Sequence, residues 1–236
     1  MNRRNLLKST AAAAATLAVG PRLFAQAAPS LSRNDQLAAI ARRELDRAGG
    51  TLWHRDLVAI ADFGLHSAHE RFHFVDLAAG KVESYLVTHG DGSDPQHDGW
   101  LKRFSNEEGS HCTSRGAYMT RGWYVGRFGT SIRLDGLDST NSNALPRAIV
   151  MHQANYATPA HVARWGRLGR SNGCFAMGPE QFDMALIRLA GGRMLYADSL
   201  GIAADGSTVT PPFPQAELLR RDPAEGTFDW TVPGAY

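Results

Sequence analysis

Residues 169–174 read Gly169-Arg170-Ser171-Asn172-Gly173-Cys174 and place a cysteine directly after a turn flanked by glycines. Glycine tolerates backbone angles that other residues avoid, so we expect the chain to bend sharply here and to expose the sulfur. In such a turn, successive backbone N–H groups point toward one spot. They are suited to hold the oxyanion that forms when a carbonyl is attacked, with Gly173, Ser171 and Asn172 in the supporting role. The stretch therefore predicts that Cys174 is a nucleophile.

A free thiol is a poor nucleophile at neutral pH because its pKa is about 8.5. His152 stands 22 residues before Cys174, at the end of the apolar run Ala148-Ile149-Val150-Met151. This run is typical of a strand, and a strand end holds a side chain rigidly. We expect His152 to lie within hydrogen-bond reach of the sulfur, to accept its proton and to lower its pKa.

Strand patterns occur on both sides of this pair. Apolar or alternating runs cover 57–63, 71–77, 82–88, 116–120, 131–134, 148–152 and 193–197, and a turn at 78–81 indicates a hairpin. Helices are expected at about 35–48, with Ser32 or Asn34 as the cap, near 159–165, and from Pro179 to about 190. Many short strands with few helices predict a mainly β fold, either a β-sandwich or a mixed sheet with a few short helices.

The first 27 residues have the features of a signal peptide. Arg3-Arg4 resembles the twin-arginine export motif, an alanine-rich stretch follows, and Ala25-Gln26-Ala27 offers a cleavage site. The polar Asn5 after the arginine pair leaves the Sec route open, and an N-terminal amphipathic helix is the structural alternative. We expect an exported protein of the periplasm or cell envelope.

The rest of the chain divides by composition into three segments. Residues 28–50 are expected to form a linker and an N-terminal helix, and residues 51–200 a single catalytic domain. Residues 201–236 contain five of the prolines and are expected to form an irregular tail packed on that domain.

Charge and hydropathy exclude two classes of function. The segment 1–27 contains four basic and no acidic residues, so its removal changes the net charge from +2 to −2. This leaves no basic excess for nucleic-acid binding. No apolar run reaches the roughly 20 residues that a membrane span needs, so no transmembrane segment is expected in the mature chain.

Several motifs together resemble one known family, and the resemblance covers roughly residues 55–198. They are Phe104-Ser105-Asn106, Gly109-Ser110-His111, Ser114-x-Gly116-x-Tyr118-x-Thr120, Gly129-x-Ser131-Ile132-Arg133-Leu134-x-Gly136-Leu137, Arg147-Ala148-Ile149-Val150-x-His152 and Ser171-x-Gly173-Cys174. This set is similar to the catalytic domain of the YkuD-like L,D-transpeptidases, in the murein L,D-transpeptidase branch.

The resemblance implies a reaction on peptidoglycan stem peptides, which serve as both donor and acceptor. Cys174 would attack the carbonyl of the third, L-centred residue, release the terminal D-alanine and leave a thioester. An amine of a neighbouring stem would then resolve the thioester and form a cross-link. His152 would be oriented by the backbone carbonyl of Gln153. The resemblance implies no metal or other cofactor.

Four further residues are expected to contact the substrate, namely Arg170, Tyr156, His111 and Tyr118. His111 lies in one of the family-like stretches, and a solvated loop histidine is the alternative interpretation. Arg133, Arg147 and Arg170 are candidates for binding carboxylates, although an arginine on a sheet surface is more often solvated or paired.

Two other patterns have less specific interpretations. His66, His69 and His73 have the i, i+3, i+7 spacing of a helical metal site, but the surrounding sequence predicts a turn into a strand. Cys112 is the second cysteine of the chain. It is either an inert thiol or the partner of Cys174 in a disulfide that would consume the nucleophile.

Three functional hypotheses follow from the sequence. Transfer of the thioester to an amine is the main one. Many relatives carry histidine in place of Asn172, glycine in place of Gln153 and a polar residue within 175–177, and these departures leave open an L,D-carboxypeptidase or stem-peptide hydrolase with the same Cys/His pair. A non-catalytic cell-wall-binding protein is the third, but such a protein needs neither Cys174 nor His152.

Overall fold

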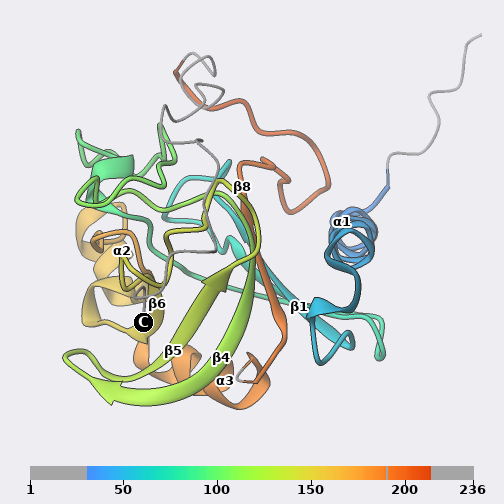
Figure 1. The fold of residues 1–236 in the computed structure, drawn as a ribbon. Helices are drawn as coiled ribbons and strands as arrows, with labels where there is room; N and C mark the ends of the chain where they lie inside the picture. The colour runs from blue at the N-terminus through green and yellow to red at the C-terminus, as the bar shows by residue number, and fades with distance from the viewer. Residues whose placement is uncertain (1–30, 190, 214–236) are drawn as a thin grey trace, which may run out of the picture.

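The computed structural model describes residues 31–189 and 191–213. Eight strands form one mixed sheet in the order β3-β2-β1-β8-β4-β5-β6-β7 (Figure 1). The strands are β1 (Leu57–Asp62), β2 (Phe72–Asp76), β3 (Lys81–Tyr85), β4 (Gly116–Gly126), β5 (Gly129–Gly136), β6 (Val150–Gln153), β7 (Phe175–Met177) and β8 (Met194–Asp198). Neighbours are antiparallel except for the parallel pairs β1–β8 and β6–β7. The predicted mainly β fold is confirmed as a mixed sheet.

Three α-helices and three short 3-10 helices accompany the sheet. They are α1 (Arg33–Ala48), α2 (Pro159–Trp165), α3 (Pro179–Leu189), η1 (Gly49–Thr51), η2 (Asp91–Ser93) and η3 (Asn155–Ala157). The side chain of Ser32 caps α1 by accepting the backbone N–H of Asp35 at 3.2 Å, which selects Ser32 over Asn34. Pro159 stands in the first turn of α2, where its missing N–H costs nothing.

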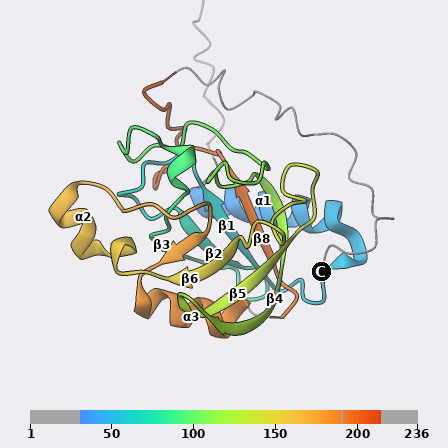
Figure 2. The ribbon, with the colours of Figure 1, turned by 60° about the vertical axis from the view of Figure 1, so that its left-hand side comes forward.

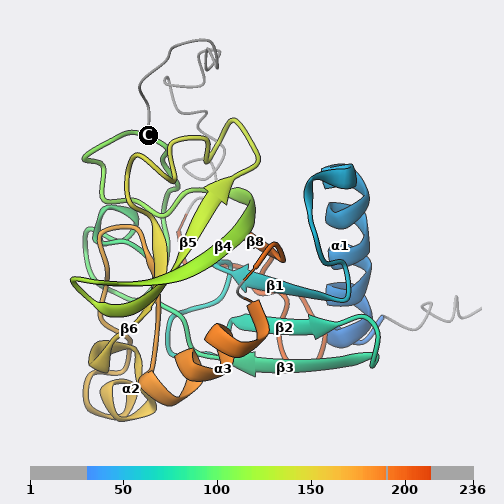
Figure 3. The same cartoon turned by 60° about the horizontal axis from the view of Figure 1, so that its bottom comes forward.

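The two faces of the sheet bury different cores. On one face the strands close around Phe72, Phe74, Tyr118, Ile132 and Phe175, and α3 covers them with Phe182, Ala185 and Leu189. On the other face α1 packs Leu37, Ala41 and Leu45 against residues of β1, β2, β4 and β8, including Val58, Ile60 and Met194. Figure 3 shows α1 and α3 on opposite sides of β1–β3.

The helix α1 covers only half of its face. Figure 1 shows α1 at one end of the molecule and α2 with β6 at the other. At that other end Met151 turns toward the core under α3. Because side chains alternate along a strand, His152 points to the opposite face of the sheet. This is the face on which α1 lies, but His152 is beyond the edge of that helix. Its register partners are Ser131 on β5 and Ala176 on β7.

The strands differ from the sequence-based prediction in two places. The hairpin β4–β5 is much longer than expected and curves beside β6 (Figure 2). Its register shifts between Thr120 and Trp123, and beyond that point Trp123 and Val125 are 64% and 74% exposed. The burial alternation that marks a strand is therefore lost in this outer part. The three-residue β7 was not expected, because a strand this short gives no periodic pattern.

The segment boundaries predicted at residues 50 and 200 do not separate independent cores. Residues 33–48 form α1, which shares a core with the sheet, so this helix is part of the domain. Beyond β8, Ile202 is buried and its N–H donates to the Asp62 carboxylate at 2.8 Å. The proposed signal peptide and residues 214–236 of the tail lie outside the described residues. Within the described part, no helix is both long and apolar enough to cross a membrane.

Candidate active site

Ser171 shapes the turn that carries Cys174. Its hydroxyl donates to the Cys174 carbonyl at 2.6 Å and accepts the Gly173 N–H at 3.2 Å. The backbone of Ser171 is tied in turn to the loop before η2, because its N–H donates to the His89 carbonyl at 3.0 Å and its carbonyl accepts the Asp91 N–H at 2.8 Å. The turn is thus fixed from both sides. Among the backbone N–H groups of the turn that were expected to face an oxyanion, that of Gly173 is already engaged by Ser171.

Gly173 is required by a close approach of two chain segments. Its φ is +109°, and a Cβ at this position would lie 2.6 Å from the Cys112 carbonyl oxygen and 2.7 Å from Cδ1 of Ile149. Any side chain here would push the nucleophile turn away from both neighbours. The glycine before the cysteine therefore allows loop 105–114 to pack directly against the turn.

His152 is a buried residue of β6 with a defined tautomer. Its Nδ1 lies 2.9 Å from the carbonyl oxygen of Gln153, which is the contact that the family resemblance implies. Because a carbonyl only accepts, Nδ1 carries the hydrogen and Nε2 is left as the basic nitrogen. Burial lowers the pKa of His152, while the hydrogen bond to Gln153 acts in the opposite direction. At neutral pH the imidazole is therefore uncharged and able to accept a proton.

The strand register places Cys174 and His152 on one face of the sheet. His152 pairs with Ala176 in the parallel ladder between β6 and β7, and Cys174 precedes Ala176 by two residues. Neighbouring strands lie about 4.8 Å apart and two residues span about 6.6 Å, so the two backbones are diagonal neighbours at about 8 Å. Side chains of this length span such a diagonal when they turn toward each other.

The thiol itself is held in a resting position. Its sulfur donates to the Ala148 carbonyl at 3.6 Å, and no hydrogen bond joins it to His152 in the part of the chain that the structure describes. Burial raises the pKa of Cys174, while the backbone N–H of Val150 and the charge of Arg147 act in the opposite direction. The expectation of a preformed pair with a lowered thiol pKa is therefore wrong for this resting state, since burial outweighs the groups that favour a thiolate.

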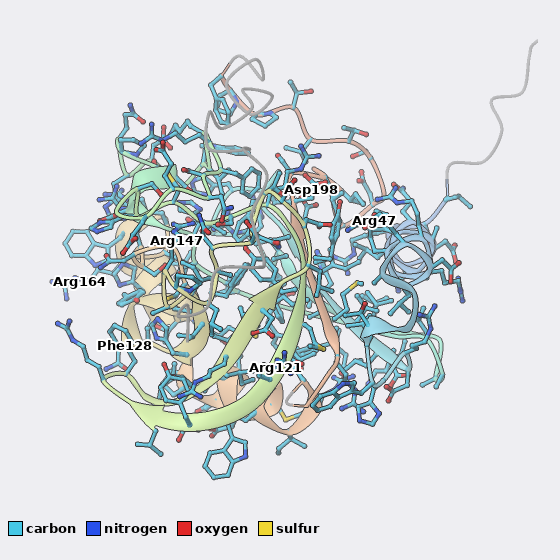
Figure 4. All side chains as sticks on the ribbon, viewed as in Figure 1. Arg47, Arg121, Phe128, Arg147, Arg164 and Asp198 are labelled. Atoms are coloured by element: carbon cyan, nitrogen blue, oxygen red, sulfur yellow. The ribbon has the colours of Figure 1, made fainter. Side chains whose placement is uncertain are left out.

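Phe128 covers His152 and was not predicted from the sequence. It stands at the turn of the hairpin β4–β5, and its ring stacks on the imidazole with centroids 4.5 Å apart and planes inclined by 18°. Figure 4 shows Phe128 near the end of the hairpin. The ring is 47% exposed, so it shields one side of His152 while remaining open to solvent on the other.

A buried polar network lies next to the turn that carries Cys174. Arg71 is fully buried and donates to the carbonyls of Val87 and Leu65, and its Nη2 lies 2.9 Å from Nδ1 of His89. Nε2 of His89 faces the Asp94 carboxylate at 3.3 Å. Burial lowers the pKa of Arg71 to about 9 and that of His89 to about 4.

Asp94 is the anionic centre of this network. Burial raises the pKa of its carboxyl, but hydrogen bonds from His89, the Gly99 N–H and Lys102 outweigh burial and lower it. The Lys102 ammonium lies 3.0 Å from the carboxylate. The His89 carbonyl accepts the Ser171 N–H, and this hydrogen bond connects the network to the backbone of the nucleophile turn.

Comparison with known proteins agrees with this arrangement. Residues 35–197 match the family described as L,D-transpeptidase catalytic domain. The chain belongs to this family. Residues 1–20 match the signal sequence of the twin-arginine translocation pathway, and the protein is thus exported across the cytoplasmic membrane.

Solved structures of the family are distant in sequence. An L,D-transpeptidase from Mycobacterium smegmatis is 13% identical with a TM-score of 0.37, covering 61% of this chain and 58% of that chain. L,D-transpeptidase 3 from Mycobacterium tuberculosis, with a faropenem-derived adduct, is 13% identical with a TM-score of 0.39, covering 61% and 60%. The helical cell shape determining protein Pgp2 from Campylobacter jejuni is 12% identical with a TM-score of 0.38, covering 67% and 55%. The match thus spans less than two thirds of each of these proteins. No curated protein matches the sequence.

Within this L,D-transpeptidase domain, two of the predicted substrate-binding residues lie beside the turn. Tyr156 in η3 packs against Gly169 and accepts the Gly169 N–H on its carbonyl at 2.9 Å. Burial and the nearby Cys174 raise the pKa of Tyr156 to about 12, so its hydroxyl is neutral. Arg170 instead donates to the backbone carbonyl of Asp94, which gives it a structural contact next to the turn.

The other predicted residues are more dispersed. His111 is half-exposed in its loop and lies 3.2 Å from the Asp91 carboxylate. Asn172 is exposed at the top of the turn. Tyr118 is fully buried, makes an edge-to-face contact with Phe175 and donates its hydroxyl to the Ser114 carbonyl at 2.7 Å. The prediction that Tyr118 contacts substrate is therefore wrong, because its strand position turns it into the core of the L,D-transpeptidase domain.

The remaining candidates have structural partners. Arg133 lies over the Tyr124 ring, and Arg147 donates to groups of loop 105–114. Cys112 is a buried free thiol, so the disulfide with Cys174 is not formed. His73 is buried on β2, and the described residues contain no cluster of His, Cys, Asp and Glu that is able to hold a metal ion.

Proposed function

We propose that the protein is a peptidoglycan L,D-transpeptidase in which Cys174 is the nucleophile and His152 the base. One observation carries the proposal. The parallel ladder β6–β7 sets Cys174 and His152 on the same face of the sheet, with Nδ1 of His152 anchored on the Gln153 carbonyl and Nε2 left to accept a proton. Family membership and export to the compartment that holds peptidoglycan support the same function.

The first step forms a thioester. The sulfur leaves the Ala148 carbonyl and turns toward the substrate. It attacks the carbonyl carbon of the third residue of a stem peptide as Nε2 of His152 takes its proton, and the Cys174 N–H at the turn is the proposed donor to the oxyanion. The bond to the terminal D-alanine breaks, and this amine leaves with the proton from His152.

The second step transfers the acyl group. An amine of a neighbouring stem peptide gives a proton to Nε2 of His152 and attacks the thioester carbon. The new amide forms as the carbon–sulfur bond breaks, and the proton returns to the sulfur. Since burial raises the thiol pKa, the resting enzyme is a neutral Cys174/His152 pair, and proton transfer accompanies the attack rather than preceding it.

The test is to incubate the exported chain with disaccharide tetrapeptide and to read the products and the enzyme by mass. A cross-linked dimer, released D-alanine and an acyl adduct on Cys174 are expected. Formation of tripeptide without dimer would indicate that the same Cys174/His152 pair catalyses hydrolysis rather than transfer. Unchanged substrate and an unmodified cysteine would favour the non-catalytic wall-binding protein. Cys174→Ala serves as the matched control for every product.

A further inference from the structure

Arg147 holds loop 105–114 through hydrogen bonds to Ser105, Ser110, Cys112 and Ser114. Its Nη1 donates to the Ser105 carbonyl at 2.7 Å and to the Ser114 hydroxyl at 2.6 Å. Its Nη2 donates to the Ser110 hydroxyl at 3.2 Å and to the Cys112 carbonyl at 2.6 Å. One guanidinium therefore gathers four points of a single loop, a task that suits its planar fork of donors.

The loop that Arg147 holds forms one wall of the nucleophile turn. The carbonyl oxygen of Cys112 accepts from Arg147 and also lies against Gly173, where it would be 2.6 Å from an added Cβ. Cys174 follows directly. The contact between guanidinium and Cys112 thus fixes a surface one residue away from the sulfur.

The backbone next to Arg147 touches the sulfur itself. Ala148 has a φ of +53°, a conformation that costs energy in a residue with a side chain and persists only where its surroundings enforce it. This conformation accompanies the placement of the Ala148 carbonyl 3.6 Å from the sulfur of Cys174. Anchoring of the Arg147 side chain and the turn hydrogen bond from the Ala148 N–H to the Leu145 carbonyl, at 3.0 Å, hold the segment in place.

The positive charge of Arg147 gives this residue a second role. Residues 175–177 after the nucleophile are apolar and buried, so they supply no positive charge to the sulfur. Among the described residues, the titratable groups near the thiol include His152 on β6, Tyr156 in η3 and Arg147, and His152 and Tyr156 are neutral at pH 7. Arg147 is a permanent cation whose charge favours the thiolate of Cys174 against its burial.

We propose that Arg147 is a positioning residue for the reaction, which holds loop 105–114 against the nucleophile turn and compensates the charge of the Cys174 thiolate as it forms. The inference rests on the proposed function, since it assumes that Cys174 reacts as a nucleophile. In this proposal Arg147 supports the nucleophile and does not bind a substrate carboxylate.

Two variants of Arg147 separate position from charge. Arg147→Gln removes both, and Arg147→Lys keeps the charge without the fork. Arg121→Gln is the matched control, because Arg121 lies on β4 away from Arg147 and pairs with Asp135 at the surface (Figure 4). The readouts are the pH profile of iodoacetamide alkylation, located on Cys174 by peptide mass, and turnover of disaccharide tetrapeptide.

We expect Arg147→Gln to move the alkylation midpoint upward by about 0.5–1 pH unit, at the low end of the effect of a nearby opposite charge, and to lower kcat about tenfold or more. Arg147→Lys should restore the midpoint but only part of kcat. Arg121→Gln should match the wild type in both. Thermal melting identifies a variant that fails to fold, in which case Arg147→Lys alone carries the test through its lowered kcat at an unchanged midpoint.

Two results would overturn the inference. Identical profiles and turnover for Arg147→Gln and Arg121→Gln would remove Arg147 from the reaction altogether. In Arg147→Gln, lost turnover with an unmoved alkylation midpoint would reduce Arg147 to an ordinary structural residue. Failure of the proposed function is recognised separately, since alkylation of Cys174 is measured without turnover, whereas a Cys174→Ala variant that still forms product would refute the nucleophile itself.

Discussion

The face of the sheet that carries α1 is divided into two unlike halves. Over β1, β2, β4 and β8 the face is apolar, and α1 seals it with Leu37, Ala41 and Leu45. Over β5–β7 the same face carries Ser131, His152 and the cysteine turn, which are buried, and η3 packs there against Ala176. We call this part the open half because α1 does not cover it (Figure 1). One continuous sheet therefore joins a half that contributes stability to a half that carries the candidate catalytic residues.

The two halves are held by different forces. The sealed half depends on burial of apolar surface, which is worth roughly 25 cal/mol per Å². The open half is held at its edges by polar contacts, such as those of Ser171 with the His89 carbonyl and of Arg147 with the Cys112 carbonyl. Substitutions in the first half should therefore change stability, and those in the second should change reactivity.

Cys174→Ala should have the largest effect of any single change. Loss of the nucleophile is expected to lower turnover on the order of 10⁴–10⁶-fold. The free energy of unfolding should change by no more than about 1 kcal/mol, because the thiol makes only a weak hydrogen bond to Ala148. Product analysis and thermal melting check the two effects. Cys112→Ala, at the other thiol, should keep most activity, and an equally inactive Cys112→Ala would contradict a mechanism with one cysteine.

His152→Ala should lower turnover by about 10²–10⁴-fold, the usual contribution of a general base. In the wild type, burial lowers the pKa of His152, so the imidazole stays neutral and active down to a pH below about 6.5, its ordinary value. The quantity kcat/KM should therefore fall only as the pH drops through this lowered pKa, where protonated His152 is unable to accept a proton. A pH–rate profile measures this limb, and a midpoint above pH 7 would contradict the assignment.

Leu37→Ala should act on the sealed half alone. Removal of this fully buried side chain of α1 is expected to cost about 2–5 kcal/mol of unfolding free energy. Alkylation of Cys174 and turnover below the melting temperature should stay as in the wild type. Ile187→Ala is the control, since this residue of α3 is 77% exposed and should change stability by less than about 0.5 kcal/mol. A Leu37→Ala enzyme with altered Cys174 reactivity would show that the halves are coupled.

Phe128→Ala should give the smallest effect. Loss of the ring stacked on His152 is worth about 0.5–1.5 kcal/mol, or a 2- to 10-fold fall in kcat/KM. Since burial is what lowers the pKa of His152, exposing the imidazole should also move the acidic limb of the pH profile upward. Trp123→Ala, an exposed residue of the same hairpin, should leave both unchanged. An unmoved acidic limb in Phe128→Ala would mean that the ring does not shield the base.

The sealed half follows closely from sequence periodicity. The apolar spacing in α1 and its Ser32 cap are local signals, and the strands β1 and β2 are apolar runs bounded by turns. The open half was predictable only in its chemistry, from the residues around Cys174 and His152. Its support was not, because the contacts of Phe128 and Arg147 join segments that are distant in the chain.

Two errors show where local patterns mislead. Tyr118 lies in one of the family-like motifs and was expected to contact the substrate, but its strand turns it inward against Phe175. A thiol near a histidine suggested a lowered pKa, but the pKa of Cys174 is set by burial, which depends on the complete fold. In both cases the missing quantity was the depth of the side chain, which a linear sequence does not encode.

The position of β8 has a consequence for the order in which this protein acquires its structure. Among the described residues β8 is the last strand, yet it lies between β1 and β4 and joins β1–β3 to β4–β7 within the sheet. Before residues 194–198 emerge, a nascent chain is able to form these two ribbons and the hydrogen bonds of Thr88 and His89 with Ala176 and Ser171, but not the pairing of β1 and β4 with β8. Closure by such a distant pairing is slow, and it exposes unpaired strand edges in the meantime. We therefore expect a late folding step in which β8 pairs with both β1 and β4 and completes the sheet.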